Sequence, residues 1–185
     1  MVNELLKETE SHMKGAIEAT KREFQAVRTG RANPGILDRV TVEYYGNPTP
    51  LNQVGNISVP DARMIVIQPW DKSILGAIEK AIQKADLGLN PVNDGSIIRL
   101  PIPQLTEERR KDLVKLVKKE SEEKKIVIRN LRRDANDKIK VLEKDGKISE
   151  DAGKKGLEDI QKLTDKYILE IEKLVEHKEK EIMEV

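Results

Sequence analysis

The sequence predicts an α+β fold: a long three-helix bundle with a small α/β domain, a β/α/β sandwich, inserted between its first and second helices. Both ends of the chain repeat apolar residues at three- and four-residue steps, the period of helices that pack along one stripe. Residues 31–104 instead hold short β-branched and aromatic runs separated by turn residues. They carry 7 basic and 7 acidic residues in 74, against 27 and 26 in the other 111. We therefore expect a bundle of residues 1–30 and 105–185 and an inserted domain of residues 31–104.

The first bundle helix is predicted between Asn3 and Thr29. Its apolar positions recur at alternating three- and four-residue steps and are Leu6, Met13, Ile17, Thr20, Phe24 and Val27. Gly30 is placed to end this helix in a left-handed conformation, and Pro34 disfavours helical geometry at the residue before it. The chain is therefore expected to leave the bundle here.

Turn signals divide the inserted domain into paired strands. Residues 40–45 alternate in β-branched and aromatic character, and Gly46 with Asn47 turns them toward a second strand. Residues 53–59 and 63–69 make another pair around Pro60 and Asp61, and residues 93–95 form a hairpin signal before a strand at 96–100. Between these pairs, either Asp71 or Ser73 caps a helix whose shared face is Ile74, Leu75, Ile78, Ile82 and Ala85.

The second bundle helix is predicted from Leu105 to Leu142. Thr106 suits its start because a hydroxyl can cap free N–H groups, and two carboxylates follow at the positive end of the helix dipole. Its expected core stripe is Leu113, Val117, Val127, Ile128, Leu131, Ala135, Ile139 and Leu142. After a turn at residues 145–147, Ser149 is expected to cap a third helix with the core positions Leu157, Ile160, Thr164, Tyr167, Ile171 and Leu174.

The opposite face of the second helix is basic. At 100° per residue, the cations of this face fall within about 60° of Arg129. Glu122 and Asn136 interrupt this face. We call its cations, with Arg129 itself, the basic rail: Lys111, Lys115, Lys118, Lys125, Arg129, Arg132, Arg133 and Lys140. The rail would extend roughly 40 Å at 1.5 Å per residue. The plainer alternative is that these residues only solvate a long helix, as most charge runs do.

Two observations favour a nucleic-acid partner over that alternative. Residues 109–140 hold 13 basic and 6 acidic residues, whereas residues 141–185 hold 9 and 13, so the positive excess is local. Residues 129–133 also use arginine, whose planar fork suits phosphate oxygens better than the compact ammonium of lysine. Because only 3% of the residues are aromatic, we expect contact with the nucleic-acid backbone rather than stacking on bases.

The composition also excludes several kinds of site. Without cysteine the chain has no disulfide, thiolate zinc site or cysteine nucleophile, which fits a reducing compartment. No apolar run approaches the roughly 18 residues of a membrane span, and residues 1–6 lack the parts of a signal peptide. His12 and His177 lie on charged helices, and there is no phosphate loop or nucleophile elbow. We expect a cytoplasmic protein without catalytic residues, metal, cofactor or membrane partner.

Five sequence blocks, in order along the chain, resemble the bacterial ribosome recycling factors. They are Val-Arg-Thr-Gly-Arg-Ala at 27–32, Val-Glu-Tyr-Tyr-Gly at 42–46, Ala-Asp-Leu-Gly-Leu-Asn-Pro at 85–91, Leu-Thr-Glu-Glu-Arg-Arg at 105–110 and Arg-Asn-Leu-Arg-Arg at 129–133. The blocks have the spacing found in that family, and the resemblance runs over the full length of the chain.

The resemblance implies an L-shaped, two-domain translation factor that is not an enzyme. Its bundle would bind the large ribosomal subunit RNA of the 70S post-termination ribosome. Elongation factor G, contacting the sandwich, would then hydrolyse GTP so that the ribosome separates into subunits for recycling. By position, the resemblance implies rRNA contacts for Arg28, Arg31, Arg110, Arg129 and Arg132, and the helical wheel adds Lys111, Lys125 and Arg133. We expect the chain to act as a monomer.

Two linkers join the predicted domains, one with Gly30 and Arg31 and the other with Pro101 and Pro103. They could form a hinge or a fixed elbow, and the sequence does not choose between these. Two other classes of protein fit the sequence less well. A structural coiled coil would explain the helical period but needs neither an inserted domain nor a one-sided arginine row. A hydrolase would need a polar constellation in the sandwich, and the sequence offers none.

Overall fold

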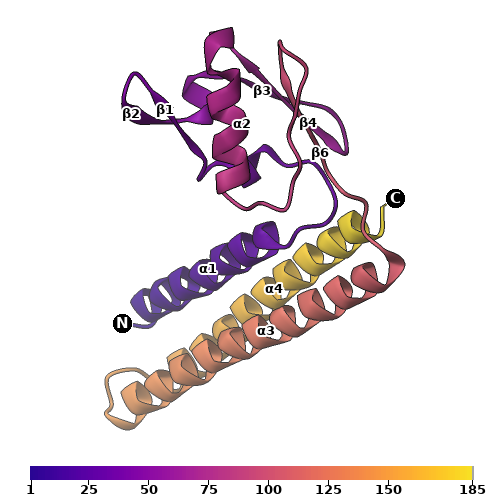
Figure 1. The fold of residues 1–185 in the computed structure, drawn as a ribbon. Coiled ribbons are helices and arrows are strands. Elements are labelled where there is room, and N and C mark those ends of the chain that lie inside the picture. Colours follow the sequence, from indigo (N-terminus) through magenta and orange to yellow (C-terminus); the bar gives the residue numbers. More distant parts are fainter. Residues whose placement is uncertain (185) are drawn as a thin grey trace. The chain divides into compact units, whose positions relative to one another are not determined.

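The computed structural model describes residues 1–184, which form two compact units. One unit contains Met1–Thr29 and the chain from Glu107 onward, and the other is Gly30–Thr106. The first is a bundle of three helices, α1 (Val2–Ala26), α3 (Glu107–Lys144) and α4 (Glu150–Met183), shown in Figure 1. The second is a small α/β unit inserted between α1 and α3. The predicted α+β class, a three-helix bundle with an inserted α/β domain, is confirmed.

The core of the bundle is one stripe on each helix. The stripes of α1, α3 and α4 meet in two buried clusters, whose fully or nearly buried members include Leu5, Met13, Ile17, Ile128, Ala135, Ile139, Ile160, Tyr167 and Ile171. Two threonines lie in the same stripes. The hydroxyl of Thr20 donates to the Ala16 carbonyl and that of Thr164 to the Ile160 carbonyl, each at 2.8 Å, so both are buried without an unsatisfied polar group.

Most residues predicted for these stripes are buried or half-buried as expected, but the prediction that Val127 belongs to the core is wrong. Its side chain is 42% exposed, because its neighbour Ile128 occupies the core and consecutive residues of a helix point about 100° apart. The cap predicted for the last helix is confirmed: the Ser149 hydroxyl accepts a hydrogen bond from the Ala152 N–H at 3.1 Å.

The end of α1 differs from the prediction. The helix ends at Ala26 rather than at Thr29, and Val27 beyond it is extended. Gly30 has the predicted left-handed conformation, with a φ of +76°, but it lies four residues past the helix end and does not terminate the helix. Its conformation therefore belongs to the segment that follows the bundle.

The α/β unit contains two antiparallel sheets and one helix. Strands β1 (Thr41–Tyr44) and β2 (Asn47–Pro50) form the smaller sheet. Strands β3 (Gly55–Asp61), β4 (Met64–Pro69), β5 (Val92–Asn93) and β6 (Ile98–Pro101) form the larger one, in the order β3-β4-β6-β5. Helix α2 (Leu75–Lys84) buries one face against the sheets. The common core consists of Leu37, Val40, Val42, Leu51, Val54, Ile65, Ile67, Leu75, Ile78, Ile82, Ile98 and Leu100.

The hairpins of this unit are those that the sequence predicts, with small corrections. Tyr45 and Gly46, with φ of 50° and 78°, turn β1 into β2. Between β3 and β4 the turn lies one to two residues later than expected, where the Asp61 carboxylate accepts from the Arg63 N–H at 2.8 Å. Of the two candidate caps, Asp71 is the one that caps, but it caps a short 3₁₀ helix (Lys72–Ile74) just before α2, accepting from the Ser73 N–H at 2.9 Å. Helix α2 itself has no side-chain cap. The prediction for Ala85 is wrong: it follows the end of α2 and is exposed.

A polar contact links α1 to α4 through the bundle core. The hydroxyl of the buried Tyr167 donates to the Glu10 carboxylate at 2.7 Å, and the Lys166 ammonium lies 3.5 Å from the same carboxylate. The hydrogen bond from Tyr167 is the main reason why the pKa of Glu10 lies below its usual value. The pKa of Tyr167 is raised, first by burial and then by this carboxylate. Ionised Glu10 therefore stabilises the folded bundle.

We predict that Tyr167→Phe destabilises the protein by about 1.5–3 kcal/mol at pH 7, the usual value of a hydrogen bond to a charged group. Because the pKa of Glu10 is depressed in the folded state, its contribution is present above its unfolded pKa and is lost as the pH falls through the folded pKa. The deficit should therefore shrink as the pH falls from 7 to about 3. Urea denaturation of both proteins over this range measures it, and a pH-independent deficit would contradict the assignment.

Candidate nucleic-acid interface

The basic rail lies on α3, and its members have different surroundings. Lys111, Lys115, Lys118, Arg129, Arg133 and Lys140 are exposed, whereas Lys125 and Arg132 are partly buried. Lys111 pairs with Glu107 one turn earlier, at 3.3 Å, and both side chains are more than two-thirds exposed. Such a surface pair contributes little and exchanges readily, so Lys111 stays accessible to another anion.

Four rail residues have neither an ion pair nor a hydrogen bond with any part of the chain that the structure describes. They are Lys115, Arg129, Arg133 and Lys140, and we call them the open rail. Long cationic side chains without a partner keep all their N–H donors available, and a row of them on one rigid helix can bind several phosphates together. The open rail is therefore a cationic surface of α3 whose donors are all available.

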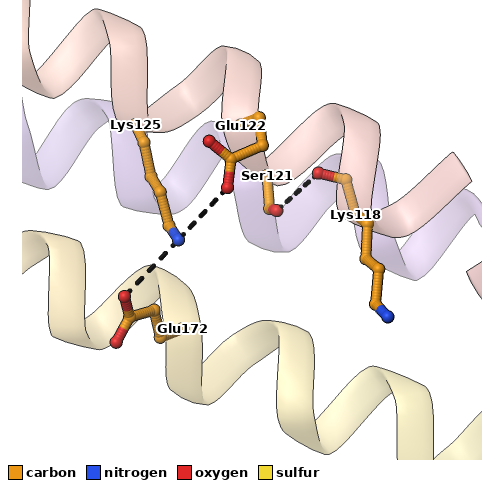
Figure 2. Close-up of polar contacts among 5 residues, drawn as sticks. All are labelled: Lys118, Ser121, Glu122, Lys125 and Glu172. Atoms are coloured by element: carbon orange, nitrogen blue, oxygen red, sulfur yellow. Dashed lines mark hydrogen bonds and ion pairs between the residues drawn. The ribbon is translucent and has the colours of Figure 1, made fainter. Parts of the chain in front are cut away.

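The prediction that Lys125 lies on the solvent-exposed face of α3 is wrong. Figure 2 shows its ammonium between Glu122 of the same helix and Glu172 of α4, at 3.4 Å from each carboxylate. The Lys125 side chain is only 15% exposed. The helical wheel placed this residue near the rim of the rail, and α4 packs against that rim. Its charge is therefore already neutralised within the bundle.

Arg132 lies beside α4 in the same way. It is half-buried, and one of its guanidinium nitrogens donates to the Gln161 side chain at 3.3 Å. One hydrogen bond leaves the other guanidinium donors of Arg132 available, because the group carries five. Arg132 can therefore support α4 and still present donors to a ligand.

The remaining predicted site residues lie near the boundaries of the two units. Arg28 is exposed at the end of the bundle's first segment, and Arg31 is exposed in the α/β unit. Arg110 lies in the first turn of α3, where it is half-buried and its Nε atom has no hydrogen-bond partner in the described chain. Each unit therefore carries cations close to the position where the chain leaves it.

The predicted hinge residues have unequal freedom. A side chain at Gly30 would come within 3.1 Å of the Leu105 side chain, so the two segments of the α/β unit that lead to the bundle are closely packed. Pro101 lies in a strand, contrary to its prediction as part of a linker: it ends β6 and faces Met64 of β4. Pro103 lies beyond the strand and is exposed. Of the two prolines, only Pro103 belongs to the connection.

Sequence reasoning missed the polar contact that fixes the end of the bundle's first segment. The hydroxyl of the buried Thr29 donates to the Glu181 carboxylate of α4 at 3.0 Å. The same carboxylate lies 3.4 Å from the ammonium of Lys178, which is itself buried. A lysine three residues before a glutamate on a predicted helix was the available signal, but nothing in the sequence pairs this glutamate with Thr29.

The fold and its cationic helix define an α+β protein with a helical bundle suited to a polyanion. A family model described as "Ribosome recycling factor" matches residues 20–183. The ribosome-recycling factors of Heliobacterium modesticaldum and Bacillus licheniformis are 62% and 60% identical to this chain over 185 residues. Each alignment covers 100% of this chain and 100% of the relative. The chain belongs to the ribosome recycling factor family.

Solved structures give the same result. A solution structure of the ribosome recycling factor shares 49% identity with a TM-score of 0.77, covering 100% of this chain and 98% of its own. A second similar structure is that of the T. thermophilus ribosome recycling factor, which is bound together with E. coli elongation factor G to the E. coli post-termination complex. It shares 48% identity with a TM-score of 0.65, and both chains are fully covered.

Two kinds of feature are absent from residues 1–184. No helix in this range combines the length and the apolar character needed to cross a membrane. In the same part of the chain, no three His, Asp or Glu side chains are grouped so that they could hold a metal ion.

Proposed function

We propose that this protein binds the RNA of the large ribosomal subunit in the post-termination ribosome and, with elongation factor G, promotes separation of the subunits. The observation that carries the proposal is the open rail, four cations on the solvent face of a rigid helix that have no partner within the described chain. Family membership supports the choice of the ribosome among polyanions. In this proposal Arg28, Arg110, Lys111 and Arg132 of the bundle add RNA contacts, and Arg31 of the inserted unit makes a separate one.

The division of labour follows the exposed side chains of each unit. The bundle carries the open rail, whereas the inserted unit exposes aromatic side chains: Tyr45 is 83% and Trp70 is 71% exposed. Exposed tyrosine and tryptophan are the side chains that most often anchor protein interfaces. We therefore assign contact with RNA to the bundle and contact with elongation factor G to the inserted unit.

The factor itself would not be an enzyme in this proposal. The energy for subunit separation would come from GTP hydrolysis by elongation factor G, and the factor would transmit its effect through the segments around Gly30 and Pro103. The proposed place of action is the cytoplasm, where post-termination ribosomes are found, and the proposed active form is a monomer without cofactor.

We predict that the double variant Arg129→Gln, Arg133→Gln binds large ribosomal subunits about 1–3 kcal/mol more weakly than the parent. The slope of log affinity against log salt should also fall by about 2, because two phosphate contacts are lost. Sedimentation binding at several salt concentrations measures both quantities. The matched control is Lys162→Gln, Lys173→Gln, which removes two exposed charges from α4. Equal losses in the two variants would refute the assignment of the open rail.

We predict that Trp70→Ala leaves binding to large subunits unchanged but slows subunit separation by elongation factor G about tenfold or more, the effect of losing an interface anchor. Light scattering of ribosomes mixed with the factor, elongation factor G and GTP measures the separation rate. Val92→Ala is the control, because Val92 is half exposed in the same unit but lacks an aromatic ring. An unchanged rate for the tryptophan variant would remove Trp70 from the proposed contact.

A further inference from the structure

The seam between α3 and α4 carries three polar contacts beside the rail. The Lys118 ammonium lies 3.8 Å from the Glu179 carboxylate, and the Lys125 ammonium lies 3.4 Å from Glu172. In the third contact, Arg132 donates to the Gln161 side-chain oxygen at 3.3 Å, and the Gln161 amide donates to Asp165 at 2.9 Å. We call these three contacts the seam ladder.

The seam ladder is periodic. On α3 its cations advance from 118 to 125 to 132, and on α4 its carboxylates recede from 179 to 172 to 165, so each step is seven residues on both helices. Seven residues are about two helical turns, and opposite directions are what an antiparallel pair requires. Every rail cation on the α4 side thus faces an acidic residue, directly or through one glutamine.

This arrangement divides the rail along its length. Lys118, Lys125 and Arg132 lie beside the acidic residues of α4, whereas the open rail lies farther round α3 and has no acidic partner among residues 1–184. Glu172 and Glu122 are 54% and 61% exposed, so the carboxylates that pair with Lys125 also face solvent. A phosphate that approached this edge would meet two carboxylates around one neutralised ammonium.

We propose that the seam ladder is the border of the RNA-contacting surface. Glu172, with Glu122, neutralises Lys125 and repels phosphate, so that the RNA backbone is kept away from Lys125 and held on the side of α3 that carries the open rail. RNA that would fit over the seam is rejected. Discrimination by a repulsive element beside an attractive one is a general means of specificity. This inference rests on the proposed RNA-binding function, and it assigns a specificity role to Glu172 and Glu122, two carboxylates that do not themselves bind RNA.

The test replaces Glu172 by glutamine, which keeps the shape of the side chain and removes its charge. The probes are an RNA duplex of unrelated sequence and purified large ribosomal subunits. We expect Glu172→Gln to bind the duplex several-fold more tightly than the parent at about 50 mM salt. Because one additional phosphate contact adds about 0.9 to the salt slope, this advantage should shrink about 3- to 4-fold by 200 mM. Preference for the subunit over the duplex should fall.

The matched control is Glu18→Gln. Glu18 lies on α1, is 61% exposed and pairs with Lys21 of its own helix at 3.2 Å, so the variant removes the same charge from a helix that does not form the seam. If Glu172→Gln and Glu18→Gln bound the duplex equally, the border would be refuted. If Arg129→Gln, Arg133→Gln also bound subunits like the parent, the proposed function would fail as well, and the two failures are therefore distinguishable.

A second variant separates the border from direct binding by Lys125. Lys125→Met keeps most of the apolar stem of the side chain and removes the ammonium. Thermal unfolding, followed by circular dichroism, identifies the temperatures at which the variant is folded, and binding is measured there. If the seam ladder is the border, the slope of log affinity against log salt for subunit binding should be the same in Lys125→Met as in the parent, because Lys125 is already paired with Glu172 and Glu122. A slope lower by about 1 would mean that Lys125 contacts phosphate itself and would overturn the proposal.

Discussion

Burial of one apolar stripe of α3 between α1 and α4 is the constraint on which the rest of the bundle depends. Ile128 and Ile139 are completely buried on this stripe, and exposing either would cost about 2–3 kcal/mol. Because side chains are fixed around a helix axis, burial of the stripe also fixes the rotation of α3. It therefore decides which cations face solvent, such as Arg129, and which meet α4, such as Lys125.

Electrostatics then act on a helix whose orientation is already set. The seam between α3 and α4 is lined by partly exposed ion pairs, which contribute modestly to stability but keep rail cations and α4 carboxylates in register. The buried contact of Tyr167 with Glu10 stabilises the packing of α1 on α4. Packing provides the rigidity, and in the proposed function charge placement determines which polyanion can approach the bundle and from which side.

The sequence predicted the periodic features well, because a repeated apolar step needs no knowledge of neighbours. It predicted α3 and α4 closely, the three hairpins and the cap at Ser149. The prediction failed where packing against another element sets the surroundings of a residue. Lys125 was assigned to the solvent face because a helical wheel considers one helix alone, whereas α4 packs beside Lys125. Pro101 was assigned to a linker because pairing of β6 with β4 cannot be read from local composition. The family resemblance came from short blocks and was confirmed over the full length.

The most direct test of the proposed interface is the reactivity of surface lysines toward an acetylating reagent, with and without bound large ribosomal subunits, read by mass spectrometry. Lys115 and Lys140 belong to the open rail on α3, and Lys162 and Lys173 are exposed on α4. If the open rail faces RNA, the first pair loses reactivity in the complex and the second pair keeps it. Protection of Lys162 and Lys173 with undiminished reactivity of Lys115 and Lys140 would contradict this placement of the RNA.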